Sequence, residues 1–459
     1  MLLNTIILSR LQFAFTISFH ILFPAFSIGL AIFLSFMEGI WLKTQKAIYR
    51  DICQFWTKVF ALTFGMGVVS GIVMEFQLGT NWSQFTQSIG GVLGALFTYE
   101  VMTAFFIEAG FLGVMLFGWE RVGPKLHYLA TLLVTIGTTL SAYWIMAANT
   151  WMQHPVGYVS QQGAYIASNW WQIALNAAIY PRFVHMLLAS YICAGFVVIS
   201  VSAFYLLRKE HTDFAKTCFK YSWIALSLIV PLQIFFGDLT GIEVKENQPI
   251  KTAAMEGLWE TQKGAPFLIL AYPDQTLQRN VWEIGIPHGA ALINTHQWNG
   301  ELQGLKTVQP ADQPHVLWVF YSFRIMVGIG GLMLLLVITS WLLGYRRKLY
   351  DSRWFLRIAV ASAPLGFIAL WFGWITAEVG RQPWAVYHLI RTADAASIVP
   401  LHDVVTSFIL IILVYGVVFG YCYIYFLNRM LRKGPAYSGK ISDQPFQYMS
   451  ASITQEHKP

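Results

Sequence analysis

Nine long apolar segments constrain this chain more than any other feature. They lie near residues 14–40, 54–78, 94–118, 126–148, 184–207, 219–239, 325–344, 355–377 and 403–428. A helix needs about 20 apolar residues to cross a bilayer, and its backbone must satisfy its own hydrogen bonds there. The composition agrees, because 56% of the residues are hydrophobic and only 12% are charged. The sequence therefore predicts an all-α, polytopic membrane protein with about nine transmembrane helices, and it excludes a soluble globular class.

Basic residues mark alternate ends of these segments. The short loops after the first, third, fifth and seventh segments carry clusters of lysine and arginine, as does the C-terminal tail, whereas the loop after the second segment carries none. Because positively charged loops stay in the cytoplasm, we expect a periplasmic N-terminus and a cytoplasmic C-terminus. The net charge of +7 follows from this topology. It does not indicate nucleic-acid binding, since the basic residues flank apolar segments and form no recognition motif.

A long polar segment interrupts the alternation of apolar segments and short loops. It runs from 241 to 314 and contains scattered proline, glycine and glutamine together with charged residues that include Lys251 and Glu256. Loops of this length in a compact protein are usually functional or disordered. We therefore expect four parts: transmembrane helices in 1–240, an extracytoplasmic loop in 241–314, further transmembrane helices in 315–430 and a cytoplasmic tail in 431–459.

Several apolar segments carry ionisable residues that are costly at bilayer depth unless they are paired or used. Glu378 and Arg381 stand at the end of the eighth segment, in GWITAEVGRQPW, and His20 lies inside the first. The third segment carries Glu100 and Glu108, which an α-helix would separate by about 80° in azimuth and about 12 Å along its axis. Both carboxyls can thus face one interior. This arrangement is typical of proton paths or ligand sets, and equally of neutral, hydrogen-bonded core residues.

His185 and Met326 are predicted to lie at a similar depth on two different segments. His185 stands just inside the fifth segment, and Met326 follows Arg324 at the start of the seventh. A histidine and a methionine on facing helices can supply both axial ligands of a haem iron, and Arg324 could pair with a haem propionate. Taken alone, Met326 is ordinary core packing. Together with His20, Glu100 and Glu378, these residues converge on one half of the membrane and predict a cofactor site in a helix bundle.

The motifs around these residues are specific and cover nearly the whole chain. They read SRLQFAFTISFH, GIVMEFQLGTNW, SAYWIMAANTWMQHPVG, FVHMLLASY, FRIMVG and AEVGRQPW. In these motifs the chain resembles subunit I of the cytochrome bd terminal quinol oxidases. Its shorter polar loop is similar to the short-loop branch, which includes cyanide-insensitive oxidases. The resemblance implies a terminal oxidase of the bacterial inner membrane that oxidises quinol, reduces dioxygen to water and charges the membrane without a pump.

The resemblance also implies a cofactor set. It comprises two haem b and one haem d, or a third haem b in place of haem d. His185 and Met326 would ligate the low-spin haem b, supported by Arg324. His20 and Glu378 would ligate the two high-spin haems, and the resemblance leaves open which of them holds the oxygen-reactive one. Trp374 and Arg381 would complete the cofactor-binding residues.

Further roles follow from the same resemblance. Glu100 would lie beside the oxygen site, and Glu108 with Ser141 would belong to a proton route from the cytoplasm. Lys251 and Glu256, in KTAAMEGLWE, would bind quinol on the outer loop, and we expect them to lie away from the iron ligands. The implied partners are subunit II, small single-helix subunits, membrane lipid, quinol and dioxygen, with no nucleic acid.

Two other classes explain part of the pattern. A transporter with buried carboxylates accounts for Glu100 and Glu108 but leaves His185 and Met326 unexplained. An electron-transfer subunit with b-type haem accounts for His185 and Met326 but leaves His20 without a role. The haem content distinguishes all three classes, because a transporter needs none and an electron carrier needs only low-spin haem.

Overall fold

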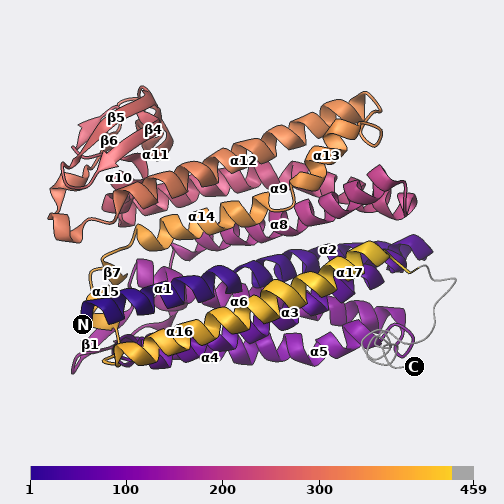
Figure 1. Ribbon diagram of the computed structural model, residues 1–459, viewed down its shortest axis with the longest axis horizontal. Helices are drawn as coiled ribbons and strands as arrows, with labels where there is room; N and C mark the ends of the chain where they lie inside the picture. The colour runs from indigo at the N-terminus through magenta and orange to yellow at the C-terminus, as the bar shows by residue number, and fades with distance from the viewer. Residues whose placement is uncertain (1, 437–459) are drawn as a thin grey trace.

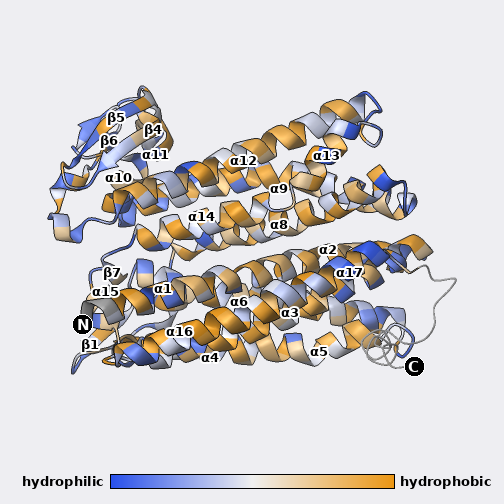
Figure 2. Cartoon of the chain, in the orientation of Figure 1, coloured by the Kyte–Doolittle hydropathy of each residue, from blue (hydrophilic) through white to orange (hydrophobic). Residues whose placement is uncertain are grey.

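The computed structural model describes residues 2–436, and long helices lying side by side make up most of it (Figure 1). In that part of the chain, nine helical stretches are long and apolar enough to cross a membrane. Apolar residues cover most of the length of these stretches (Figure 2). The predicted all-α polytopic fold is confirmed, and the tail predicted for 431–459 lies mostly outside the described residues.

Each predicted apolar segment matches an observed stretch, to within one residue at its ends. The stretches are α1 Leu2–His20 with α2 Leu22–Thr44, α3 Ala47–Thr80, α4 Ser83–Glu100 with α5 Phe106–Phe117, α6 Pro124–Gln153, α8 Ile179–Arg208, α9 Thr212–Asn247, α12 Val316–Tyr345, α13 Arg353–Ala361 with α14 Leu365–Val379, and α16 Leu401–Tyr415 with α17 Ile424–Lys433. The helices are longer than the apolar segments, because their polar end turns continue the same backbone hydrogen bonding.

Proline and π-helical turns divide several of these stretches. The first breaks at Ile21, where Pro24 cannot donate the backbone hydrogen bond that the carbonyl of His20 would accept. The eighth breaks at 362–364 before α14, which the sequence analysis did not predict, and Pro364 accounts for it in the same way. Two π-helical segments occur, η1 Val101–Phe105 between α4 and α5 and η4 Gly416–Tyr423 between α16 and α17.

The helices form two groups that lie next to each other (Figure 1). In one group α8, α9, α12 and α14 pack together, around a core that includes Phe196, Trp223 and Phe355. In the other, α1–α6 pack with α16 and α17, around a core that includes Trp56 and Phe60. Contacts between α2 and α8 join the groups.

The connections at one end of the helices are ordered. That end, which we name the loop end, holds the N-terminal end of α1, whereas α17 finishes at the opposite end (Figure 1). After α6 come β1 Tyr158–Gln161, β2 Ala164–Ala167 and α7 Trp170–Ala174; after α14 come β7 Trp384–Val386, β8 Ile390–Arg391 and α15 Thr392–Ala395. The strands pair antiparallel as β1–β2 and β7–β8.

The long polar segment is folded onto the loop end. Because α9 continues to Asn247, this segment begins at 248 and ends where α12 starts at Val316. It contains α10 Pro249–Glu256, β3 Gln262–Lys263, β4 Phe267–Asp274, β5 Arg279–Ile286, α11 Gly289–Thr295, β6 Glu301–Leu302, η2 Leu305–Thr307 and η3 Pro310–Asp312. Antiparallel pairs β3–β6 and β4–β5 form two small sheets. A core around Trp259 and Leu305 also includes Val316, so the loop and α12 fold together.

Candidate functional site

His185 and Met326 belong to the same four-helix group, on α8 and α12. Each faces a glycine on a neighbouring helix. A Cβ placed at Gly237 of α9 would lie 3.1 Å from His185 Cε1, and one at Gly373 of α14 would lie 2.8 Å from Met326 Sδ. The Nδ1 atom of His185 is buried without a hydrogen-bond partner among the described residues. On these sides the His185 ring and the Met326 sulfur therefore face a glycine and no bulky side chain.

These features fit the predicted haem. Among the described residues, no group of three or more His, Cys, Asp and Glu side chains could hold a bare metal ion. Haem iron already has four ring nitrogens, so the protein supplies only one or two axial ligands, such as a histidine or a histidine with a methionine. An unpartnered histidine nitrogen and a thioether that each face a glycine match that requirement.

Arg324 connects this helix group to the long loop. Its Nη2 donates to Glu256 Oε2 at 2.8 Å and its Nε to the Leu268 carbonyl at 2.5 Å, while its Nη1 has no partner among the described residues. Asn294 donates to the other oxygen of Glu256 at 3.0 Å. The expectation that Glu256 lies away from the ligand residues is wrong, because it pairs with an arginine two positions before Met326. Nη1 remains available for an anionic group such as a propionate.

A second buried network surrounds Glu378 at the end of α14. Glu378 Oε1 accepts from Asn149 at 2.9 Å and from Gln153 at 3.1 Å, and its other oxygen pairs with Arg381. Gln153 Oε1 in turn accepts from Lys251 Nζ at 2.6 Å. Lys251 is therefore one residue removed from a predicted iron ligand, which also contradicts the expectation that it lies apart. A carboxylate has about four acceptor positions, so three are used and one remains.

The charges of this network shape the chemistry of Lys251. Burial lowers the pKa of its ammonium well below the usual range, and the cations of Arg182 and Arg381 act in the same direction. Glu378 and Glu243 oppose the shift. A lowered pKa favours the neutral amine, which can accept a proton, whereas an ordinary surface lysine stays protonated. Arg381 is buried, and its Nε and Nη1 atoms have no partner among the described residues.

His20 lies in the other helix group, at the end of α1. Its Nδ1 is 3.0 Å from Ser70 Oγ on α3. Beside it, Trp371 of α14 donates its indole N–H to the Ser18 carbonyl at 2.6 Å. Since Gly373 of the same helix faces Met326, α14 reaches both groups. Trp374, half-buried on α14, follows Gly373 directly.

Glu100 and Glu108 stand on either side of the π-helical turn η1. A π-helical turn holds more residues than an α-helical turn, so it rotates Glu108 back toward the azimuth of Glu100 and improves the predicted alignment. Ser141 of α6 donates to Glu100 at 2.6 Å. Glu108 is buried against Gly137, one turn along α6, and its Oε1 has no hydrogen-bond partner among the described residues. Ser141 therefore contacts Glu100 rather than Glu108.

Two polar clusters were missed by the sequence analysis. Asn149 and Gln153 hold Glu378, and their spacing of four residues at the end of an apolar segment was a detectable signal. At the opposite end of α6, His127 Nδ1 lies 2.6 Å from Glu38 Oε1, and Thr131 donates to Glu38 at 2.6 Å. His127 and Thr131 are also four residues apart, but Glu38 comes from a distant segment.

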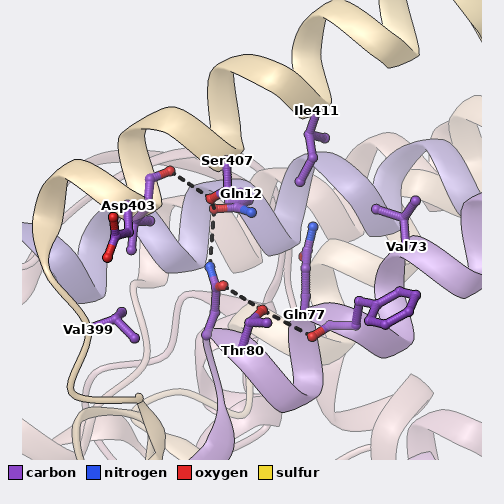
Figure 3. Close-up of a pocket in the computed structure, with 11 residues that line it drawn as sticks. Gln12, Val73, Gln77, Thr80, Val399, Asp403, Ser407 and Ile411 are labelled. Carbon is purple, nitrogen blue, oxygen red and sulfur yellow. Dashed lines mark hydrogen bonds between the residues drawn. The ribbon is translucent and has the colours of Figure 1, made fainter.

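A separate concavity lies between α1, α3 and α16 at the loop end (Figure 3). Gln12 accepts hydrogen bonds there from Asn81 at 3.1 Å and from Ser407 at 3.4 Å. None of the predicted site residues lines it. It is thus distinct from the networks around Arg324 and Glu378.

Comparisons with known proteins agree with this architecture. A family model described as cytochrome bd terminal oxidase subunit I matches residues 8–435. Cytochrome bd-II ubiquinol oxidase subunit 1 of Escherichia coli is 34% identical, over 97% of this chain and 99% of that protein. Cytochrome bd ubiquinol oxidase subunit 1 of Bacillus subtilis is also 34% identical, over 97% and 98%. The structure of the bd oxidase from Geobacillus thermodenitrificans has a TM-score of 0.88 at 28% identity and covers 94% of this chain and 99% of that one.

Proposed function

Because this chain belongs to the cytochrome bd terminal oxidase subunit I family, we propose that it is the haem-binding subunit of a respiratory oxidase that transfers electrons from quinol to dioxygen and forms water. Membership of the family and the nine apolar helices make it a multi-pass protein of the bacterial inner membrane. Haem and quinol are the cofactor and the substrate that the family implies. The finer assignments below are proposals.

His185 and Met326 are proposed as axial ligands of a low-spin haem b. His20 and Glu378 are proposed to ligate two high-spin haems, one haem b and one haem d or a second haem b in its place. Haem, when bound, supplies one-electron transfer and the reduction of oxygen. The protein contributes ligand atoms held on packed helices. Arg324, Trp374 and Arg381 are proposed as further cofactor contacts.

Quinol is proposed to bind where the loop meets the bundle, between Lys251 and Glu256. Glu256 is fixed by Arg324 and Asn294, so its carboxylate has a defined position for a quinol hydroxyl. Burial lowers the pKa of Lys251, which favours the neutral amine, the form that can accept a proton. Protons released there leave on the loop side. The region 241–314 is thus proposed as the quinol-binding part, between haem-binding regions in 1–240 and 315–430.

Proton uptake is proposed to run from the opposite side through Glu108 toward Glu100 and Ser141. The Oε1 atom of Glu108 has no hydrogen-bond partner among the described residues. Consumption of protons on one side and release on the other charges the membrane without a pump. Each elementary charge moved against 100 mV stores about 2.3 kcal/mol.

The remaining proposals concern sidedness and partners. The distribution of lysine and arginine supports a periplasmic N-terminus and loop end and a cytoplasmic C-terminus. Subunit I of this family pairs with subunit II, and small single-helix subunits are proposed as additional partners. Lipid surrounds the complex, and no feature calls for nucleic acid.

The observation that carries the proposal is the pair His185 and Met326. They occupy one helix group, each facing a glycine, and Arg324 links that group to Glu256 of the loop. The test is a visible spectrum and a pyridine haemochrome assay of the purified complex, together with quinol-dependent oxygen uptake. We expect low-spin and high-spin haem with oxygen uptake. Protein without haem would indicate a transporter, and low-spin haem alone would indicate an electron carrier.

A further inference from the structure

The β4–β5 hairpin of the loop has an apolar outer face that none of the described residues covers. Five side chains form it, and we name them the hairpin face: Leu270, Tyr272, Trp282, Ile284 and Ile286. Leu270 and Ile284 are cross-strand partners, and Ile286 follows two residues after Ile284 on the same side of β5. Tyr272 and Trp282 lie next to them, where the register shifts between Ala271 and Pro273. Exposed fractions range from 47% for Leu270 to 60% for Ile284. Contiguous apolar surface of this kind marks an interaction site.

The opposite face of the hairpin is turned toward the protein. Its β4 residues Leu268 and Ala271 are buried against Phe320, whereas its β5 residues are more polar. Asn280 accepts a hydrogen bond from Trp259 at 2.9 Å and donates to the Gly257 carbonyl at 3.0 Å. Glu283 accepts from Asn280 at 2.7 Å. Water-soluble sheets bury their apolar face and expose their polar one. In β5 the pattern is inverted, which is the arrangement expected where the outer medium is itself apolar.

The hairpin lies beside a membrane-spanning helix (Figure 1). Tyr321 of α12 donates to the Ala271 carbonyl at 2.7 Å, and Arg324 donates to the Leu268 carbonyl at 2.5 Å. Arg324 is eight residues into α12, about 12 Å from the start of that helix. The hairpin therefore flanks the first turns of a span that runs from Pro310 to Tyr345.

The surface of α12 beside the hairpin is also apolar, as expected next to lipid or at the membrane interface. Trp318 and Ile325 are exposed and lie seven residues apart, on one face of α12. In sequence they lie on either side of Tyr321 and Arg324, the residues that contact β4. Tryptophan and tyrosine are enriched at membrane–water interfaces, where a ring can contact acyl chains while its polar atom reaches water. Trp318, Tyr272 and Trp282 provide such rings at this level.

We propose that the hairpin face is a membrane-contact surface, seated in the headgroup and upper acyl region of the leaflet on the loop side. The hairpin is thus an interfacial element, although it belongs to the polar loop. Its inner edge holds Arg324 through Leu268, so lipid contact on one face fixes the depth of the ion pair with Glu256 on the other. This inference needs only the membrane location and does not depend on the proposed oxidase chemistry.

The test places a fluorophore on the hairpin face of the complete oxidase in lipid nanodiscs. Ile284→Cys carries the environment-sensitive label, and Glu301→Cys, an exposed position on β6 of the same loop, is the matched control. Cys53, Cys193 and Cys218 are buried, and Cys422 is replaced by serine. Haem content equal to that of the parent protein shows that each variant is folded.

Lipid carrying a nitroxide near its headgroup and aqueous iodide serve as the two quenchers. We expect the label at 284 to be quenched several-fold more by the lipid nitroxide than the label at 301, and several-fold less by iodide. Equal iodide quenching at both positions would overturn the proposal, because the face would then lie in water. Protection of position 284 from both quenchers would also overturn it, because another protein subunit would then cover the face.

Discussion

Carboxylates at the loop end and carboxylates in the middle of the bundle have different partners. Glu243, Glu256 and Glu378 each pair with an arginine. Glu100 accepts from a serine, and Glu108 leaves one oxygen without a partner among the described residues. A carboxylate paired with an arginine is held in one position, which suits ligation and substrate docking. An unpaired buried carboxyl can change its protonation, which suits proton transfer.

The first prediction tests whether His185 and Met326, in the four-helix group, hold a cofactor, and it has the largest expected effect. His185→Ala and Met326→Ala each remove an axial ligand, so we expect loss of the low-spin haem signal and of quinol oxidation. The measurement is the reduced-minus-oxidised spectrum at equal protein concentration. His402→Ala, at an exposed position, is the control. Unchanged low-spin spectra in both variants would remove the ligand assignment.

The second prediction concerns Glu108, a carboxyl in the middle of the bundle that pairs with no arginine among the described residues. Glu108→Gln keeps the size of the side chain but cannot carry a proton, so we expect haem to stay bound while oxygen reduction falls by about 100-fold or more. Oxygen uptake and membrane potential in proteoliposomes are measured at matched haem content. Glu120→Gln, on the exposed turn after α5, should be silent. Near parental activity and charging in Glu108→Gln would leave Glu108 a purely structural role.

The third prediction separates pairing from docking at Glu256. Glu256→Ala leaves Arg324 buried without its anion, which costs about 3–5 kcal/mol of stability. Glu256→Gln preserves hydrogen bonding, so we expect a smaller loss of stability, while both variants slow quinol turnover. Thermal unfolding and steady-state kinetics measure the two effects, and Glu260→Ala, exposed on the same loop, is the control. Equal stability of the Ala and Gln variants would contradict the pairing argument.

The smallest effect is expected at Lys251 and appears in the pH dependence. Its pKa is lowered in the folded protein, so the neutral amine is present above that pKa and disappears as the pH falls through it. We expect quinol oxidation to decline on the acid side for that reason. Lys251→Met should lower activity and remove this decline, whereas Lys263→Met should leave the profile intact. An acid limb that persists in Lys251→Met would assign it to another group.

The apolar pattern was enough to predict the nine spans, because long apolar segments have few alternatives to helices in a membrane. The break at Ile21 also has a local cause in the sequence, because Pro24 has no backbone N–H to donate. The π-helical turn at 101–105 was not, since its residues have no distinctive local signal. Lys251, Gln153 and Glu378 come from three distant segments, and only tertiary packing brings them together. The separation expected between the loop and the ligand residues failed because α9 and α10 continue directly into the bundle.

Gln153 gives this arrangement a directional property. A carboxamide has one donating end and one accepting end, and here they point to Glu378 and Lys251 respectively. Glu378 can become a donor to Gln153 only if the amide rotates to present its oxygen. The same rotation would turn the amide nitrogen toward Lys251, which would lose its acceptor. A proton placed on Glu378 is therefore sensed at Lys251 through one side chain. The two orientations of the Gln153 amide thus couple the hydrogen bonding of Glu378 to that of Lys251.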